Sequence, residues 1–259
     1  MQKAIYLEKE YPFGRHSGNM NTKTKVVIFD IFNTLFHNET NLWEDTFDQI
    51  CQEQKLRLDP KYLFNQWKNT ENKRRLERVN MGDPDKSQPF VSYRNMWEEC
   101  FVSTFVDLGL QGDANAATRT IFKHMAVREP FAETTDMIDY LGRRYTLAVL
   151  SNADVDFLHP LLNRHKLSFS TVVCSEEIQA YKPHPKAFQK VLTTLNISSS
   201  EAIHVGDSLT EDVQGSINLG LRSAWINRQG MVNTIENLRP DYEFKHLYEL
   251  KSILNKIPN

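Results

Sequence analysis

The first apolar run of the chain is short and ends in a carboxylate. Residues 26–29 are four consecutive apolar positions, and Asp30 follows them directly. Asn33 and Thr34 then lead the chain away from this run. A short apolar run that is bounded by turn residues predicts a buried strand, here with Asp30 at its carboxyl end.

The residues before this strand show no clear hydrophobic period. We expect residues 1–23 to form an N-terminal tail, because the polar lead from Met20 onward is how a domain of this kind usually begins. Residues 1–19 are then either a tail or the product of a misassigned upstream start codon. The alternative is a short ordered element that packs on the core.

A long helical block follows the first strand. Between residues 41 and 128 no segment has a convincing strand pattern, and apolar residues instead recur three or four positions apart. A loop rich in Gly, Pro and Asp interrupts the block at residues 81–89. The stretches predicted to be helical are residues 42–54, 62–79, 93–110 and 116–127.

From residue 129 onward, strand and helix patterns alternate, which predicts parallel strands with right-handed helical crossovers. The predicted strands lie within residues 145–154, 170–175, 202–208, 222–228 and 241–244, and the predicted helices are residues 133–144, 184–195, 211–220 and a last one ending near Ile257. The predicted fold class is α/β. Residues 24–38 and 129–259 would form a Rossmann-like parallel sheet core, and residues 39–128 an inserted all-helical cap domain.

The composition narrows the function classes without naming one. The chain has 259 residues, 40% of them hydrophobic, which is enough for a large core with a subdomain. A net charge of −2 gives no reason to expect capture of nucleic acid or of a membrane surface. The three cysteines form no disulfide framework and no zinc pattern, which favours a cytoplasmic location. We expect a monomer or a homodimer.

Polar side chains follow the later strands, as Asp30 follows the first. The carboxyl ends of parallel strands line the ligand crevice of an open sheet, so these side chains are expected to meet. They are Ser151 and Asn152 after the second predicted strand, Lys182 in a proline-flanked loop, Asp207 at the end of a further strand, and Asp212 five positions later.

With these motifs in this order, the chain resembles the haloacid dehalogenase (HAD) superfamily of hydrolases. Each motif alone is weak, but four in order, each at the end of a predicted strand, are a specific signal. The resemblance covers about residues 24–245 and includes a helical cap inserted after the first strand. It implies that Asp30 is the nucleophile. The residues that it implies around the transferred group are Thr34, Ser151, Asn152 and Lys182.

The phosphatases of this superfamily imply a Mg²⁺ ion and a small phosphorylated substrate. A phosphoryl group that passes to Asp30 needs donors and positive charge at its equatorial oxygens. By resemblance, Mg²⁺ would be held by Asp30, the backbone carbonyl of Phe32 and Asp207, with Asp212 acting through a water. Phe32 stands where these enzymes have an acid/base aspartate, and losing a positioned acid/base typically costs about 10²–10⁴ in rate.

An aromatic residue at position 32 resembles instead the metal-independent 2-haloacid dehalogenases of the superfamily. A halide leaves without protonation, and Asp30 would form an ester that water cleaves. The cap arginine of those enzymes corresponds here to Lys68, and their tyrosine to Phe188. Against this alternative, Asp207 stands where they have a serine, and Leu209 replaces their asparagine.

Charge counting favours the phosphatase interpretation. Asp30, Asp207 and Asp212 would face the single Lys182, and like charges at such separations are unfavourable unless one is protonated or a cation binds. A hard divalent ion suits an all-oxygen site. A third interpretation, a catalytically silent protein that binds metal and phosphate, is disfavoured because Ser151 and Lys182 are retained together with Asp30.

Several other residues have plainer interpretations. His204 is expected to be a packed strand residue. The basic run at residues 72–78 is expected to be a solvated helix face, with a minor alternative of contacting an anionic substrate. Trp43, Trp67 and Trp97 are expected to form the core of the cap rather than to contact substrate.

Overall fold

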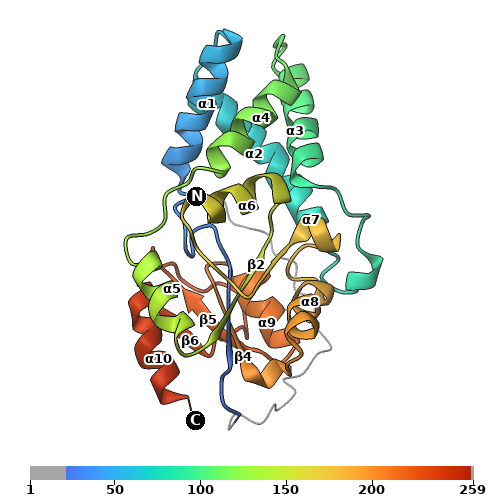
Figure 1. Ribbon diagram of the computed structural model, residues 1–259. Coiled ribbons are helices and arrows are strands. Elements are labelled where there is room, and N and C mark those ends of the chain that lie inside the picture. The colour runs from blue at the N-terminus through green and yellow to red at the C-terminus, as the bar shows by residue number, and fades with distance from the viewer. Residues whose placement is uncertain (1–21, 258–259) are drawn as a thin grey trace.

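The computed structural model describes residues 22–257. It consists of a parallel sheet with helices on both faces and of a group of helices that rises above the carboxyl edge of the sheet (Figure 1). The expected tail of residues 1–19 lies outside the described residues. The predicted α/β class, a Rossmann-like core with an inserted helical cap, is confirmed.

The sheet has six strands in the order β3-β2-β1-β4-β5-β6, and all neighbouring strands are parallel. The strands are β1 (Val26–Phe29), β2 (Thr146–Ser151), β3 (Thr171–Cys174), β4 (Ala202–Gly206), β5 (Arg222–Ile226) and β6 (Tyr242–Phe244). In this order the crossovers change direction between β1 and β4. Ligands of open α/β sheets bind outside the carboxyl ends of the strands at such a point.

Strand β1 is buried on both faces, which explains its unbroken apolar run. Side chains alternate along a strand, so Val27 and Phe29 join the hydrophobic cluster that includes helices α5, α6 and α10, whereas Val26 and Ile28 pack on the side of α8. The core helices are α5 (Thr134–Gly142), α6 (Val155–Arg164), α7 (Ser175–Ile178), α8 (Pro185–Leu195), α9 (Gly215–Asn218) and α10 (Leu250–Lys256).

Two of these helices, α6 and α7, are absent from the sequence prediction. Pro160 lies inside α6, and a proline in a helix interior normally removes a hydrogen bond and argues against a helix. Burial outweighs this cost here, because Phe157, Leu158, Leu161 and Leu162 all enter the core. Helix α7 is a single turn. The short helical turns of the core are η2 (Ser199–Glu201), η4 (Leu247–Glu249) and the π-helical η3 (Leu209–Gln214).

The four cap helices agree with the four predicted stretches. They are α1 (Thr40–Gln54), α2 (Pro60–Glu77), α3 (Tyr93–Asp107) and α4 (Ala114–Met125), with the turn η1 (Pro84–Lys86) in the predicted loop. Asp59, Ser92 and Asp113 cap α2, α3 and α4 through side-chain hydrogen bonds to first-turn amides. Trp67 and Trp97 are buried as expected, whereas Trp43 is half-buried.

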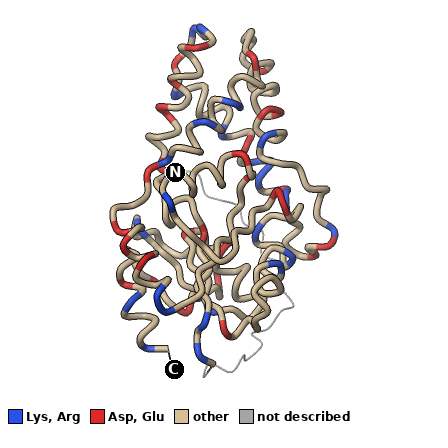
Figure 2. Tube along the Cα trace, in the orientation of Figure 1, with Lys and Arg blue, Asp and Glu red and all other residues tan. Residues whose placement is uncertain are grey.

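Basic and acidic residues are interspersed over both the cap and the core (Figure 2). Among the helices that the structure describes, none combines the length and the apolar character needed to cross a membrane.

Candidate active site

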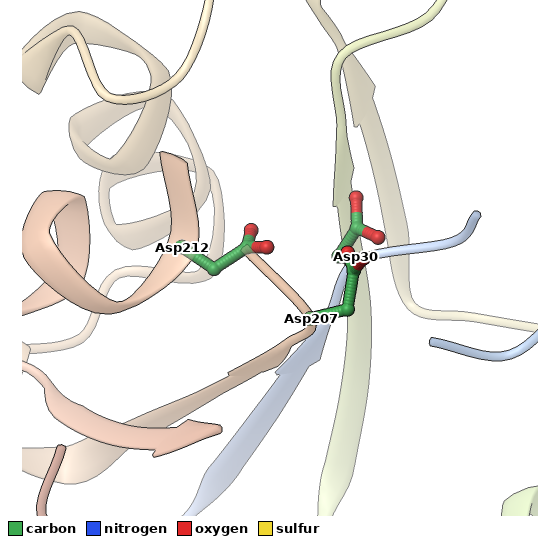
Figure 3. Close-up of side chains that lie close together, drawn as sticks. All are labelled: Asp30, Asp207 and Asp212. Atoms are coloured by element: carbon green, nitrogen blue, oxygen red, sulfur yellow. The ribbon is translucent and has the colours of Figure 1, made fainter. Parts of the chain in front are cut away.

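Three carboxylates meet at the carboxyl edge of the sheet (Figure 3). Asp30 follows β1, Asp207 follows the neighbouring β4, and Asp212 reaches in from η3. Oxygen atoms of the three side chains lie within 4.8 Å of one another. The strand order thus brings together residues that are far apart in the sequence, at the point where an open sheet of this kind binds its ligand.

The chain after β1 makes a tight turn that is held by an arginine from the far end of the sequence. Asn33 has a φ of 61°, in the left-handed region that asparagine tolerates better than most residues. The guanidinium of Arg228 donates to the carbonyl oxygens of Asn33 (3.2 Å) and Thr34 (2.8 Å) and pairs with Glu133 (2.8 Å). The sequence offered no signal that Arg228 fixes this turn.

Gly206 is required by the close approach of Asp212. A side chain at Gly206 would overlap the carboxyl group of Asp212. The Ser208 amide donates to Asp212 Oδ2 at 3.0 Å, and the Ser208 hydroxyl accepts from the Glu211 amide at 3.1 Å, which begins η3. The Gly-Asp-Ser run therefore sets Asp207 and Asp212 side by side.

Lys182 is buried among these carboxylates. Its Nζ donates to Asp30 Oδ1 at 2.8 Å and to Asp212 Oδ1 at 2.6 Å. Burial alone would lower the pKa of Lys182, but the charges of Asp212 and Asp30 outweigh it and raise that pKa above its ordinary value. Lys182 is therefore a permanent cation that bridges Asp30 and Asp212.

One lysine does not compensate three carboxylates. Burial raises the pKa of Asp30 to about 6, against the opposing charge of Lys182. Burial, together with the charges of Asp30 and Asp212, raises the pKa of Asp207 well above its usual range. Only for Asp212 is burial outweighed, because Lys182 and His204 together lower its pKa. The excess negative charge favours either protonation of Asp207 or binding of a cation.

The donor set fits a hard divalent cation. The three groups that converge are all carboxylates, and oxygen is the ligand atom that Mg²⁺ prefers. Asp30, Asp207 and Asp212 are the residues that would hold it, and its charge would relieve the repulsion among them. The carbonyl of Phe32, the fourth ligand implied by the family resemblance, stays a prediction.

Of the other predicted site residues, Ser151 contacts Asp30, Asn152 contacts Lys182, and Thr34 contacts neither. Ser151 Oγ lies 3.5 Å from Asp30 Oδ1. The Asn152 side chain holds the backbone of Lys182, accepting from its N–H at 2.7 Å and donating to its carbonyl at 3.2 Å. Thr34 is fully buried, lines no part of the cavity described below, and its hydroxyl has no partner within residues 22–257. Thr34 therefore does not line the cavity, and its implied role at the transferred group stays a prediction.

A cavity of about 460 Å³ separates the carboxylates from the cap. Phe32 lines it, half-buried, and its ring centroid lies 5.8 Å from that of Phe157. Trp43 and Trp97, which were expected to serve only as cap core, also face this space. The aromatic residues of the wall are Phe32, Trp43, Phe64, Tyr93, Trp97 and Phe157.

Two cations of α2 also line the cavity, and each has a carboxylate partner. Lys68 Nζ lies 2.8 Å from Glu71, which is buried. Arg75 reaches from the cap to Glu211 of η3, with an Nη2–Oε1 distance of 2.8 Å. The predicted substrate cation Lys68 is thus in place at the wall, but its charge is already paired.

The interpretation of residues 72–78 as a solvated helix face is wrong at Arg78. Its side chain is only 7% exposed and lies over the rings of both Tyr93 and Tyr181, with guanidinium-to-centroid distances of 4.6 and 4.2 Å. Arg78 also pairs with the buried Glu71 at 3.4 Å. Stacking of a guanidinium on aromatic faces explains how a charged residue is accommodated inside this joint between cap and core.

His204 has a role that the sequence interpretation did not include. It is buried in β4, as expected, but its Nε2 lies 2.8 Å from Asp212 Oδ1. Burial lowers the pKa of His204, so the ring is neutral and Nε2–H donates to the carboxylate. Nδ1 has no hydrogen-bond partner in the described part of the chain. The only feature of the sequence that could have indicated this role is that His204 is a polar residue inside an otherwise apolar strand.

Known proteins with similar sequences fall on both sides of the choice between phosphatase and dehalogenase. The human N-acylneuraminate-9-phosphatase is 29% identical over 146 residues, which are 53% of this chain and 56% of that enzyme. The chain thus spans about half the length of this relative. The (S)-2-haloacid dehalogenase of Pseudomonas sp. (strain YL) is 28% identical over 162 residues, 61% of this chain and 68% of that enzyme.

The fold is shared with solved structures at lower identity. The crystal structure of YfnB from Bacillus subtilis, bound to magnesium, superposes with a TM-score of 0.76 at 19% identity and covers 90% of this chain and 100% of its own. The family model described as haloacid dehalogenase-like hydrolase matches residues 27–226, from β1 through β5 and across the whole cap. The strand order, the carboxylate cluster and this match together place the chain in the haloacid dehalogenase-like hydrolase family.

Proposed function

We propose that this hydrolase is a Mg²⁺-dependent phosphohydrolase that acts on a small phosphorylated metabolite through Asp30. The observation that carries the proposal is the convergence of three carboxylates beside a single lysine, which contacts two of them, Asp30 and Asp212. A dehalogenase that uses no metal would have to keep this excess negative charge beside an anionic substrate, which is unfavourable. A bound Mg²⁺ removes the difficulty and supplies charge stabilisation to the transferred phosphoryl group.

In this proposal each residue has a defined task. An oxygen of Asp30 attacks phosphorus in line with the leaving oxygen and forms an aspartyl-phosphate. Lys182 and Ser151, which contact Asp30, stabilise the equatorial oxygens of the phosphoryl group. Asn152 keeps the backbone of Lys182 in place and contacts the substrate from the cavity wall. Lys68 forms part of the substrate cavity wall from the cap while it stays paired with Glu71.

The second candidate function is metal-independent 2-haloacid dehalogenation, and Phe32 is the observation that favours it. A phenyl ring in the cavity wall supplies no acid for a leaving oxygen, and a halide needs none. Asp207 is the observation against it. Its pKa is raised well above the usual range, so without a metal the site would keep a strained or protonated carboxyl with no task.

Measuring activity with and without Mg²⁺ distinguishes the phosphohydrolase from the dehalogenase. Phosphate release from a panel of phosphate esters and halide release from 2-haloacids would be followed with Mg²⁺ and with a chelator. We expect phosphate release that requires Mg²⁺ and that is abolished in Asp30→Asn, while the surface variant Asp139→Asn keeps it. Halide release that is unaffected by the chelator, with no phosphate release from any ester, would contradict the proposal.

A further inference from the structure

Phe32, which stands in place of the usual acid/base aspartate, is also part of the surface that a leaving group would contact. Phe32 lies two residues after Asp30 and lines the cavity between the carboxylates and the cap. On the cap side of the same cavity, aromatic residues share the wall with Lys68, Glu71 and Arg75. Ring pairs continue inward, with Trp97 and Phe157 stacked at 6.0 Å and 15°. A group leaving from phosphorus would therefore enter a space whose walls are partly aromatic.

The charges in the cap wall favour an uncharged group in this space. Lys68 is paired with Glu71 at 2.8 Å, and Arg75 with Glu211 at 2.8 Å. Glu71 is buried and also contacts Arg78, so drawing Lys68 away toward a second anion would leave a buried carboxylate less well paired. A leaving group that bears its own carboxylate would have to break such a pair.

From the aromatic wall, the paired charges and the missing acid, we infer that the substrates are aryl phosphates, monoesters of a phenolic hydroxyl that carry no second anionic group. This inference rests on the proposed phosphohydrolase function and names its substrate class. A phenol ionises near pH 10, whereas a simple alcohol is nearly as weak an acid as water, near 15.7, so phenolate leaves roughly five orders of magnitude more readily without protonation.

The reaction balances without an acid at position 32. In the first step an oxygen of Asp30 bonds to phosphorus, the bond from phosphorus to the aryl oxygen breaks, and phenolate leaves with the electron pair. In the second step a water oxygen bonds to phosphorus and the bond to Asp30 breaks. One water proton passes through solvent to phenolate, so the products are phenol and hydrogen phosphate.

The second step still lacks the base that would activate water. We therefore expect a rapid release of about one phenol per Asp30, followed by slower turnover as the aspartyl-phosphate hydrolyses. An acidic leaving group accelerates the first step alone and therefore gives such a burst. A general improvement in catalysis would accelerate both steps and give none.

The test uses four esters that vary the ring and the acidity of the leaving group independently. Phenyl phosphate has both features, benzyl phosphate has only the ring, acetyl phosphate has only the acidic leaving group, and ethyl phosphate has neither. With Mg²⁺ we expect the highest kcat/KM for phenyl phosphate. Trp43→Leu should lower the ratio of kcat/KM for the phenyl or benzyl ester to kcat/KM for acetyl phosphate by about three- to tenfold.

Trp43 is half-buried at the cavity wall, and the matched control is Tyr62→Leu on the exposed surface of the same cap. Retained Mg²⁺-dependent turnover of acetyl phosphate shows that the Trp43 variant is folded and active. If that variant does not fold, the order of the four esters in the wild-type protein decides. Ethyl phosphate cleaved as well as phenyl phosphate would overturn the aryl assignment and leave the phosphohydrolase standing. No phosphate release from any of the four would overturn both.

Discussion

Among the three carboxylates, Asp212 has the most contacts that fix its position. Its Oδ1 accepts from Lys182 Nζ and from His204 Nε2, and its Oδ2 accepts from the Ser208 amide. Because Lys182 Nζ also contacts Asp30, any movement of Asp212 is passed on to the proposed nucleophile. His204 thus acts on the site through Asp212, without contact to a substrate.

Replacing His204 should therefore weaken the metal site. We expect His204→Leu to lower the affinity for Mg²⁺ by about 10- to 100-fold, the usual cost of removing a hydrogen-bond partner from a ligating side chain. His204→Gln retains a donor and should recover part of the loss. The measurement is the Mg²⁺ concentration that gives half-maximal phosphate release. A folded His204→Leu protein with an unchanged half-maximal concentration would show that the contact has no influence on the metal.

Phe32 is the second residue with a specific prediction. Phe32→Asp should raise the turnover of alkyl phosphates by up to about 10²–10⁴, because it restores an acid for the leaving oxygen and a base for the water. Phe32→Asn is the matched control, with the same size as aspartate but no proton to transfer, and it should give no gain. Equal rates in the two variants, both folded, would argue against the proposed acid defect.

The sequence predicted the positions of some proposed site residues but not the contacts of others. Asp30 and Asp207 each follow an apolar run directly, so their meeting requires only that the two strands be parallel neighbours. The contact of His204 with Asp212 depends on how η3 folds back over β4, and no periodicity encodes that. The same holds for Asn152, whose amide is committed to the backbone of Lys182.

At the scale of elements, the cap is joined to the core at the first turn of α3. Asp154 follows β2, and its carboxylate accepts from the amides of Tyr93 (2.9 Å) and Arg94 (2.8 Å). First-turn amides have no partner inside their own helix, so this core residue satisfies two of them. Tyr181 adds a hydrogen bond from its hydroxyl to the carbonyl of Val91 at 2.6 Å.

Asp154→Ala should destabilise the protein strongly. It leaves the buried amide of Tyr93 and the partly buried amide of Arg94 without an acceptor. At about 1–3 kcal/mol for each amide, we expect a loss of roughly 2–6 kcal/mol in the free energy of unfolding. Asp156→Ala is the control two residues away, since Asp156 is 65% exposed and forms only a surface pair with Arg94. Its loss should stay below about 1 kcal/mol in denaturant titrations. Equal losses would contradict the proposed joint.

Periodicity predicted most elements and failed at identifiable places. The cap helices and the six strands carry clear apolar patterns, and Asp59, Ser92 and Asp113 are recognisable helix caps. Helix α6 was not predicted because it contains Pro160, and proline disfavours a helix interior. Burial of the apolar side chains of α6 stabilises the helix despite the proline. The predicted helix of residues 211–220 is present as η3 and α9, but the pattern did not predict that its first part is π-helical.

At the scale of the whole molecule, Mg²⁺ should act as a stabilising ligand. Relief of repulsion among two buried carboxylates and one partly buried carboxylate implies binding to the folded state alone. Such binding adds about 2.7 kcal/mol when Mg²⁺ is present at 100 times its dissociation constant. Asp207→Asn should abolish most of the increase in melting temperature, whereas Asp139→Asn, on the exposed face of α5, should retain it. A wild-type melting temperature that does not respond to Mg²⁺ would contradict the metal site.

The most direct test of the account is the mass of the peptide that contains Asp30 after a rapid acid quench. The protein would be mixed with Mg²⁺ and phenyl phosphate, and a second sample with a 2-haloacid and a chelator. We predict a phosphoryl group on Asp30 in the first sample, present in wild type because water is poorly activated and absent in Asp30→Asn. Unmodified Asp30 in the first sample, together with an ester adduct on Asp30 in the second, would contradict the phosphohydrolase and establish the dehalogenase in its place.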